Sequence, residues 1–434
     1  MRNTCKEVYV VDGCRTPFLK THGRPGPFSA SALAFTAGRA LLARQPFEPA
    51  ALDEVIVGCV IPGPGEANIS RVIALRLGCG WCMPAWTVQR NCASGMQALD
   101  SAFMSIRTGR SHLVLAGGTE AMSHAPLQLN YRMVNWLADL WSAKNIRRKL
   151  RTLTKFRPAL LKPVIALQCG LTDPIVGLTM GETAEVLAHN FDISREEMDA
   201  YSAESHRRLA HARDRGFLDE IEVIYDRKGN FYNEDEGLHR GINAKILAKL
   251  RPVFDHGVGK VTAGNSSQIT DGACLMLLAS KDAVDRYNLP VLGRIIDSRW
   301  AALDPTEMGL GPVHAVPPLL QANDVTPVDI DYWEINEAFA GQVLSCLRAW
   351  ESEEYCRNIL GLDSEFGSID RDRLNVDGGA ISLGHPIGAS GARIVLHLLH
   401  VMKRNNARRG VAALCVGGGQ GGAMLLERTE GSHD

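Results

Sequence analysis

The chain has 434 residues, of which 45% are apolar and 22% charged, and its formal net charge is -1. These proportions are those of an ordinary globular protein with enough core material for two or three domains. The balanced charge gives no general case for nucleic-acid binding, and eleven irregularly spaced cysteines in so long a chain exclude a small disulfide-stapled scaffold.

The N-terminal segment, Met-Arg-Asn-Thr-Cys-Lys-Glu, leads directly into an apolar strand at residues 8–11. No signal-peptide core precedes this strand, and no apolar run in the chain is long enough to span a bilayer. The one Cys-x-x-Cys, Cys79 to Cys82, lacks the second pair or nearby histidine that a zinc site needs. We therefore expect reduced cysteines, no bound metal and a cytoplasmic or similarly reducing location.

Strand and helix patterns alternate along the chain, and their order occurs twice. In each half a Gly/Ser-rich segment opens a helix, and a strand that ends in Gly-Gly follows. This alternation predicts an α/β fold with covered sheets and a duplicated architecture. The expected strands are 55–61, 113–118, 332–336 and 410–416, and the expected helices are 70–77, 95–107, 338–350 and one within 375–402.

The alternation breaks in the middle of the chain, where a charged, mostly helical stretch is interrupted by prolines. We interpret this stretch as an inserted loop domain, after which the core pattern resumes. The predicted division is 1–121 for the first part of the N-terminal half, 122–251 for the insertion, 252–285 for the completion of that half, and 286–434 for the C-terminal half.

Cys92 lies in the stretch Val88-Gln-Arg-Asn-Cys-Ala-Ser-Gly-Met, between a short apolar run and a helical pattern. The spacing predicts a thiol at a strand-to-helix turn, where the N–H groups and dipole of the helix favour the thiolate. The small residues that follow let another molecule approach the sulfur. Cys92 is therefore a candidate nucleophile, although most cysteines in cytosolic proteins are inert small hydrophobes.

His385 lies in the glycine-dense segment Gly378-Gly-Ala-Ile-Ser-Leu-Gly-His-Pro-Ile-Gly-Ala-Ser, with a helix expected to begin near Ser390. Glycines allow close approach of a ligand, and the near-neutral pKa of histidine suits a general base. The alternative is a phosphate-binding loop with an incidental histidine, but the spacing matches neither a P-loop nor a dinucleotide fingerprint.

Two further candidates stand at the ends of apolar strands. Cys415 precedes the run Gly417-Gly-Gly, whose unobstructed backbone N–H groups suit an oxyanion hole. The alternative is a buried strand cysteine before a tight turn. Asn336 follows the strand Tyr332-Trp-Glu-Ile and could hold a water or a carbonyl through its amide, or simply cap the next helix.

Together these segments resemble the thiolase family, in family order and over nearly the whole chain. The resemblance implies two duplicated mixed-sheet α/β halves in a five-layer arrangement, with a mostly helical loop domain that helps to hold CoA. The motifs that carry it are Arg15-Thr-Pro-Phe, Asn91-Cys-Ala-Ser-Gly, Thr262-Ala-Gly-Asn-Ser-Ser, Asp271-Gly-Ala, Asn336-Glu-Ala-Phe, Gly384-His-Pro-Ile-Gly-Ala-Ser-Gly-Ala and Cys415-Val-Gly-Gly-Gly-Gln-Gly.

The resemblance also implies a reaction. Thiolases cleave a 3-ketoacyl-CoA with a second CoA through a covalent S-acyl-cysteine, or run the reverse condensation. By analogy Cys92 is the nucleophile, His385 its base, and Cys415 the acid that protonates the departing acetyl-CoA carbanion. One oxyanion hole would combine His385 with a water held by Asn336. The other would consist of the backbone N–H groups of Cys92 and Gly417. No metal or redox cofactor is implied, because CoA is a substrate.

Three residues match or adjoin family positions around the substrate. Ser267 and Met180 match positions that line the CoA and acyl pocket, and Phe339 is expected to wall it, unless it is plain core. Many biosynthetic members have a histidine where this chain has Thr179, so the acyl-chain preference stays open. An acidic insert at 351–373 and an extended stretch at 130–176 favour the degradative, trifunctional-complex type, although Asn336 stands where those enzymes commonly have histidine.

The stretch 130–162 has a composition of its own. A helical stripe of Trp136, Leu137, Leu140 and Trp141 precedes Lys144–Lys162, which holds eight Lys/Arg and no acidic residue. A basic amphipathic segment with tryptophans can lie on an anionic membrane or dock a partner. The third interpretation is a solvated helical hairpin whose tryptophans pack on the core of the protein.

Three functions compete. The leading one is a degradative 3-ketoacyl-CoA thiolase of fatty-acid β-oxidation, and its enzymatic rival is a biosynthetic acetoacetyl-CoA thiolase that condenses two acetyl-CoA. A non-catalytic lipid carrier or scaffold on the same fold is disfavoured because all four reactive residues are present. A ketoacyl synthase is also disfavoured, because this chain has a second thiol where those enzymes usually have His or Asn. The expected partners are acyl-CoA, CoA, a second copy or more in a homodimer or homotetramer, and a β-oxidation hydratase/dehydrogenase subunit.

Overall fold

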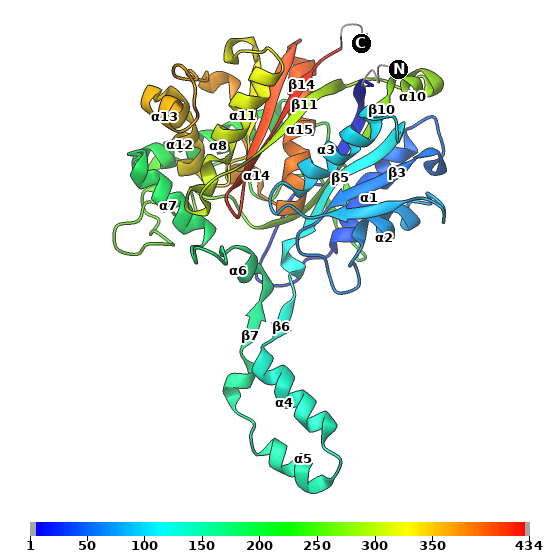
Figure 1. Cartoon of the computed structure of the whole chain (residues 1–434), viewed down its shortest axis with the longest axis vertical. Coiled ribbons are helices and arrows are strands. Elements are labelled where there is room, and N and C mark those ends of the chain that lie inside the picture. Colours follow the sequence, from blue (N-terminus) through cyan, green and yellow to red (C-terminus); the bar gives the residue numbers. More distant parts are fainter. Residues whose placement is uncertain (1–5, 430–434) are drawn as a thin grey trace.

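The computed structural model describes residues 6–429 and centres on a ten-stranded mixed sheet (Figure 1). The strand order is β12-β13-β14-β11-β1-β10-β5-β3-β4, with β2 paired to β10. The strands are β1 (Val8–Arg15), β2 (Leu19–Lys20), β3 (Glu54–Gly58), β4 (Ala85–Val88), β5 (Leu113–Ala121), β10 (Thr270–Ser280), β11 (Gly293–Ala302), β12 (Tyr332–Ile335), β13 (Arg409–Val416) and β14 (Gln420–Glu427).

The sheet consists of two halves with the same pairing pattern. In the first half β3 and β5 are parallel, and β10 and β1 continue antiparallel. In the second half β12 and β13 are parallel, and β14 and β11 continue antiparallel. The halves meet where β1 pairs with β11. This repeated order confirms the duplicated architecture predicted from the sequence.

Helices cover both faces of each half and give five layers. Two long helices, α3 and α15, lie between the halves, and their apolar side chains form one core with both halves of the sheet. Separate cores join α1 and α2 to the first half, and α11 and α12 to the second. The helices of the body are α1 (Ala30–Ala43), α2 (Ile69–Arg76), α3 (Ser94–Arg107), α10 (Lys281–Tyr287), α11 (Gly311–Ala322), α12 (Ala340–Glu351), α13 (Glu353–Asn358), α14 (Ala380–Leu383) and α15 (Ile387–Arg404).

Glycines allow the two central helices to cross in close contact. A Cβ on Gly95 of α3 would lie 2.9 Å from the carbonyl oxygen of Gly388 in α15, and a Cβ on Gly118 of β5 only 1.9 Å from the same atom. No other residue fits at such a distance. Because Cys92 and His385 each stand three residues before a crossing glycine, the crossing brings their two loops to the same end of the helix pair.

Several predicted boundaries are wrong by a few residues. The strand expected at 113–118 runs to Ala121, and the helix expected at 338–350 begins at Ala340. The strand expected at 55–61 ends at Gly58, because the backbone N–H groups of Val60 and Ile61 bond the carboxylate of Glu120 instead of another strand. The helix expected to begin near Ser390 begins at Ile387, directly after the predicted loop histidine and Pro386.

Between β5 and β10 the chain leaves the sheet and is mostly helical. Serine and threonine capping boxes begin two of its helices, α7 and α8. The elements of this region are β6 (Leu127–Leu129), α4 (Tyr131–Ser142), α5 (Ile146–Leu153), β7 (Pro163–Ile165), α6 (Ala166–Gly170), α7 (Met180–Asn190), α8 (Arg195–Asp214), β8 (Ile224–Tyr225), β9 (Phe231–Tyr232) and α9 (Ala244–Leu247).

Residues 127–165 form an arm that projects away from the body (Figure 1). Its stalk is the β6–β7 ribbon, and α4 and α5 lie beyond it. Trp136 packs inside the arm, where its Nε1 donates to the Thr152 carbonyl at 2.9 Å and its ring meets Phe156 at 5.3 Å. Trp141 is 92% exposed. The interpretation that the tryptophans pack on the core of the protein is therefore wrong.

Candidate active site

Cys92 lies in the turn between β4 and α3, as its sequence context predicts. Asn91 adopts a left-handed φ of 42°, which Asn tolerates better than most residues. The Asn91 Nδ2 donates to the Gly417 carbonyl at 2.8 Å, and the Ser94 Oγ donates to the Asn91 carbonyl at 2.7 Å. These bonds fasten the cysteine loop of one half to the glycine turn of the other.

The thiol of Cys92 is protonated at neutral pH. Its surroundings are dense, and burial raises its pKa to about 11, against the lowering effect of the N–H groups of Gly417 and of Cys92 itself. The expectation of a favoured thiolate is therefore wrong, because burial outweighs the helix N-terminus. The N–H groups of Cys92 and Gly417 both lie within hydrogen-bonding reach of the Cys92 sulfur.

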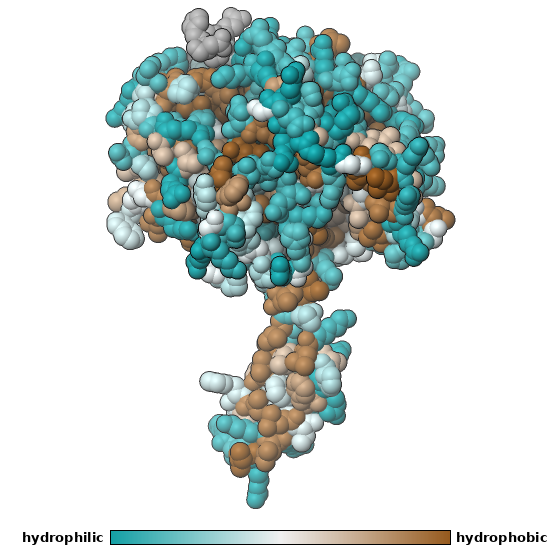
Figure 2. Space-filling view, turned by 180° about the vertical axis from the view of Figure 1, so that it is seen from behind, coloured by the Kyte–Doolittle hydropathy of each residue, from teal (hydrophilic) through white to brown (hydrophobic). Residues whose placement is uncertain are grey.

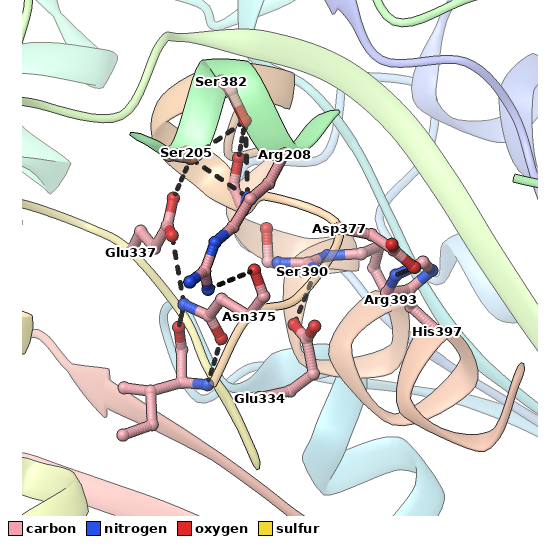
Figure 3. A network of polar contacts seen from close by, with 12 residues as sticks. Ser205, Arg208, Glu334, Glu337, Asn375, Asp377, Ser382, Ser390, Arg393 and His397 are labelled. Atoms are coloured by element: carbon pink, nitrogen blue, oxygen red, sulfur yellow. Dashed lines mark hydrogen bonds and ion pairs between the residues drawn. The ribbon is translucent and has the colours of Figure 1, made fainter. Parts of the chain in front are cut away.

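His385 is a buried, neutral imidazole. Its Nδ1 lies 2.6 Å from the Ser390 Oγ, which itself donates to the Pro386 carbonyl at 3.1 Å (Ser390 is labelled in Figure 3). We assign the proton to Nδ1, because the serine proton is already used. Nε2 then carries the free lone pair and has no protein partner in the described residues. Burial and the charge of Arg393 lower the pKa of His385 to about 3, so its imidazole is unprotonated at neutral pH.

Asn336 is fully buried just after β12. Neither the oxygen nor the nitrogen of its amide has a hydrogen-bond partner in the part of the chain that the structure describes. The alternative role as a helix cap is wrong, because α12 begins at Ala340 with Phe339 as its N-cap. A buried amide without a protein partner is suited to bind a water or a ligand oxygen.

Cys415 is buried near the end of β13. It lies close enough to Cys92 for a charge on that residue to affect its pKa. Burial raises the pKa of Cys415 well above its usual value, and a thiolate at Cys92 would raise it further, so Cys415 holds its proton. Its neighbours are apolar and form one cluster: Ala184, Val261, Met308, Ala338 and Phe339, with Met180 and Phe254 packed against them.

The predicted pocket residues gather around this cluster. A Cβ on Gly417 would lie 3.2 Å from the Met180 sulfur, so Met180 borders the glycine turn. The ring of Phe339 meets that of Phe254 at 6.2 Å. The Ser267 N–H donates to the Ala338 carbonyl at 2.9 Å, which ties the serine to the segment that follows Asn336.

Sequence reasoning missed residues that support the reactive ones. Ser390 orients His385, and the glycine-rich motif that contains both was the available signal. Glu120 accepts N–H bonds from Val60 and Ile61 at 2.9 and 3.0 Å, and burial raises its pKa to about 7. The residues that bond Glu120 lie about 60 positions away in the sequence, so no local pattern could have indicated this contact. Across residues 6–429, no group of three or more His, Cys, Asp or Glu side chains is placed to hold a metal ion.

The sequence matches two families, described as thiolase, N-terminal domain, over residues 8–282 and thiolase, C-terminal domain, over residues 289–428. It is 34% identical over 427 residues to a 3-ketoacyl-CoA thiolase of Serratia proteamaculans, covering 97% of this chain and 96% of that one. It is also 34% identical over 423 residues to the mitochondrial trifunctional enzyme subunit beta of Bos taurus, covering 97% and 88% of the two chains.

Solved structures give the same result. The acetyl-CoA acetyltransferase of Bacillus anthracis and the human mitochondrial 3-ketoacyl-CoA thiolase each superpose with a TM-score of 0.83 at 35% identity. These matches cover 98% of this chain, and 100% and 99% of the two structures. The matches span both halves and all four sequence motifs around the reactive residues, and the chain therefore belongs to the thiolase family of acyltransferases.

Proposed function

We propose that this thiolase cleaves 3-ketoacyl-CoA with CoA, giving acetyl-CoA and an acyl-CoA shortened by two carbons, as in fatty-acid β-oxidation. The observation that carries the proposal is the neutral imidazole of His385, whose Nδ1 is tied to Ser390 so that Nε2 is free to take a proton. It lies at the same end of the crossing helices as the protonated thiol of Cys92.

The first half-reaction follows from these protonation states. His385 Nε2 takes the Cys92 proton as the sulfur attacks the 3-keto carbon, and the new oxyanion is held by N–H donors. The C2–C3 bond then breaks, and its electron pair becomes the carbanion of acetyl-CoA. Cys415, which holds its proton because of burial, protonates that carbanion.

The second half-reaction returns the enzyme to its starting state. The thiol of CoA gives its proton to the Cys415 thiolate and attacks the acyl group on Cys92. The Cys92 sulfur leaves with the electron pair of the thioester bond and takes back its proton from His385. We assign one oxyanion hole to His385 and a water on Asn336, and the other to the N–H groups of Cys92 and Gly417. Ser267, Met180 and Phe339 would line the CoA and acyl pocket. These steps use CoA as substrate and require no further cofactor.

A ladder of 3-ketoacyl-CoA substrates tests the proposed function. We expect thiolysis from acetoacetyl-CoA through medium or long chains, measured as loss of the 3-ketoacyl-CoA absorbance. The second candidate is a biosynthetic acetoacetyl-CoA thiolase, which is kept because an acetyl-CoA acetyltransferase is as similar to this chain as a 3-ketoacyl-CoA thiolase is. Activity confined to acetoacetyl-CoA would favour that candidate.

A homodimer or homotetramer is part of the proposal. The edge strand β4 has unpaired backbone groups on its outer side and leads directly to Cys92. Trp86 on this strand is exposed, as is Met104 on the adjoining α3, and an exposed apolar edge strand is a site for pairing with a second chain. Light scattering of the purified protein should give at least twice the mass of one chain, and a monomer would contradict this assignment.

The location and the other partners are also proposals. The ten cysteines that the structure describes are all free thiols, which supports a reducing compartment such as the cytoplasm. The similarity to a trifunctional enzyme subunit beta supports a hydratase/dehydrogenase subunit as a further partner.

The arm is proposed to contact an anionic membrane surface. Residues 127–165 hold nine Lys/Arg and one acidic residue, Asp139. Apolar side chains follow the arm from stalk to tip (Figure 2), and the exposed ones are spaced on one face of each helix: Val134, Leu137 and Trp141 on α4, and Ile146, Leu150 and Leu153 on α5. Apolar residues beside excess positive charge are the composition of a segment that lies in a membrane interface. No helix in the described residues is long and apolar enough to cross a bilayer.

Substitution of Trp141 by serine should weaken vesicle binding about 10-fold, because burying one large apolar side chain contributes about 1.5–3 kcal/mol. The measurement is co-sedimentation with vesicles that contain phosphatidylglycerol. Binding should be lost at about 0.5 M salt, since each basic residue contributes about 1 kcal/mol through a screened interaction.

Val328→Ser is the matched control, because Val328 is 89% exposed on the body and its loss should leave binding unchanged. Absence of binding at low salt, or equal binding to pure phosphatidylcholine, would contradict membrane contact. Capture of a hydratase/dehydrogenase subunit without lipid binding would assign the arm to a protein partner instead.

A further inference from the structure

Within residues 6–429 the side chain of Asn336 has no hydrogen-bond partner, so neighbouring residues must determine where its amide lies. The residue before it, Ile335, is bonded on both backbone atoms by one side chain. The Ile335 N–H donates to the Asn375 Oδ1 at 2.9 Å, and the Asn375 Nδ2 donates to the Ile335 carbonyl at 2.9 Å (Figure 3). Asn375 thus replaces a neighbouring strand at the end of β12.

The residue after Asn336 is a buried carboxylate with four hydrogen-bond donors. Oε1 of Glu337 accepts from the Tyr201 hydroxyl at 3.0 Å and from the Asn375 Nδ2 at 3.1 Å. Oε2 accepts from the Ser205 Oγ at 2.7 Å and from the Ile381 N–H at 3.3 Å. Each carboxylate oxygen thereby has two donors, which matches its bonding capacity.

These donors come from segments far apart in the sequence. Tyr201 and Ser205 belong to α8 of the loop region, and Ile381 belongs to α14, four residues before His385. Burial, and then the charge of Glu337, raises the pKa of Tyr201 well above its usual value, so its hydroxyl remains a donor. Glu337 therefore links the Asn336 segment to the segment that leads to the catalytic histidine.

The backbone on the His385 side is shaped for this contact. A Cβ on Gly379 would lie 2.4 Å from the Glu337 carboxyl carbon, so only glycine leaves room for the carboxylate. Between Gly379 and His385 the short helix α14 turns sharply at Gly384, which has a φ of 113°. The glycines of this motif thus admit the carboxylate as well as the histidine.

We propose that Glu337 is a positioning residue that fixes the amide of Asn336, and so the water of the oxyanion hole, relative to His385. The inference rests on the proposed function, in which Asn336 and His385 share that hole. Glu337 and its four donors form a clamp, and one of these donors, Asn375, also bonds the backbone of Ile335 on the other side of Asn336. An oxyanion donor contributes only when it points at the position of the developing charge. The clamp holds the Asn336 amide in the orientation that this requires.

Glu337→Gln tests the proposal with little change of volume. One acceptor oxygen becomes an amide N–H₂ that faces two donors, so the clamp loses at least one bond. We expect kcat for thiolysis to fall about 10- to 100-fold, as for other residues that orient a reacting group, with KM for both substrates within about twofold. Alkylation of Cys92 by iodoacetamide should keep its rate, because Glu337 does not contact the cysteine loop.

Two variants keep the test decisive. Tyr201→Phe and Ser205→Ala each remove one donor but keep the carboxylate, so each should lower kcat by less than Glu337→Gln does, even if the glutamine variant folds poorly. Glu220→Gln is the matched control, because Glu220 is a buried carboxylate bonded by Arg15 and His397 and does not contact the Asn336 segment. Its kcat per folded molecule should equal that of the wild type.

The outcomes separate the inference from the proposed function. Unchanged kcat in folded Glu337→Gln would overturn the inference. A fall in kcat accompanied by slower Cys92 alkylation and a lower melting temperature would also overturn it, because this combination indicates a merely structural role. A wild-type protein that cleaves no 3-ketoacyl-CoA would instead contradict the proposed function.

Discussion

Replacement of Cys92 by alanine should abolish thiolysis, with turnover at least about 10⁴-fold below the wild type, because no sulfur is then available to form the acyl thioester. The fold should survive, because the thiol is a small group that packs against the central core and fills little of it. Mass spectrometry of protein incubated with acetyl-CoA should show an acetyl adduct in the wild type and none in the variant. The melting temperature should change by only a few degrees, as a small substitution outside the core implies.

Two other cysteines provide controls for this result. Cys274→Ala removes a thiol that is fully buried in the central sheet and does not belong to the site, so turnover should persist. Cys415→Ala should lose thiolysis but keep the acetyl adduct, because the proposed role of Cys415 is to protonate the carbanion rather than to carry the acyl group. Persistent thiolysis in Cys92→Ala, or an adduct on another cysteine, would contradict the mechanism.

The sequence predicted the reactive residues better than their protonation states. The motifs around Cys92 and His385 are local, and the turn before each helix could be predicted from glycines and apolar spacing. The pKa of Cys92 depends on how many atoms surround the sulfur, and those atoms come from both halves of the fold. A helix N-terminus favours the thiolate, but burial outweighs it and raises the pKa to about 11.

The supporting residues illustrate the same limit. Ser390 lies five residues from His385, and the distance to the imidazole follows from the first turn of α15. Glu337 is adjacent to Asn336 in the sequence, yet its role depends on Tyr201 and Ser205, which stand more than 130 residues away. Short-range patterns therefore identified which side chains react, but not which side chains hold them.

The arm shows a different reason for a partial prediction. The stripe of Trp136, Leu137, Leu140 and Trp141 divides between two faces, because Trp136 turns toward Phe156 while Trp141 points to solvent. Periodicity identified an amphipathic helix correctly, but the pairing of α4 with α5 decided which apolar side chains are covered. The exposed remainder is what motivates the proposed membrane contact.

Replacement of His385 by alanine should lower thiolysis about 10³-fold, within the range for loss of a general base, and should also change how the rate depends on pH. In the wild type the pKa of His385 is lowered to about 3 and that of Cys92 is raised to about 11. The neutral pair is then the reactive form, so kcat/KM should be nearly flat from about pH 6 to about pH 9.

In His385→Ala the cysteine must lose its proton to solvent before it can attack. The thiolate fraction rises tenfold per pH unit below the thiol pKa, so the residual kcat/KM should rise by about tenfold per unit over the same range. Ser390→Ala is the matched control: it removes only the hydrogen bond to Nδ1, so the rate should fall about 10-fold while the profile stays flat. An acid limb near pH 6 to 7 in the wild type would mean that His385 titrates normally and that burial does not keep it neutral. A flat profile in His385→Ala would mean that another group takes the proton of Cys92.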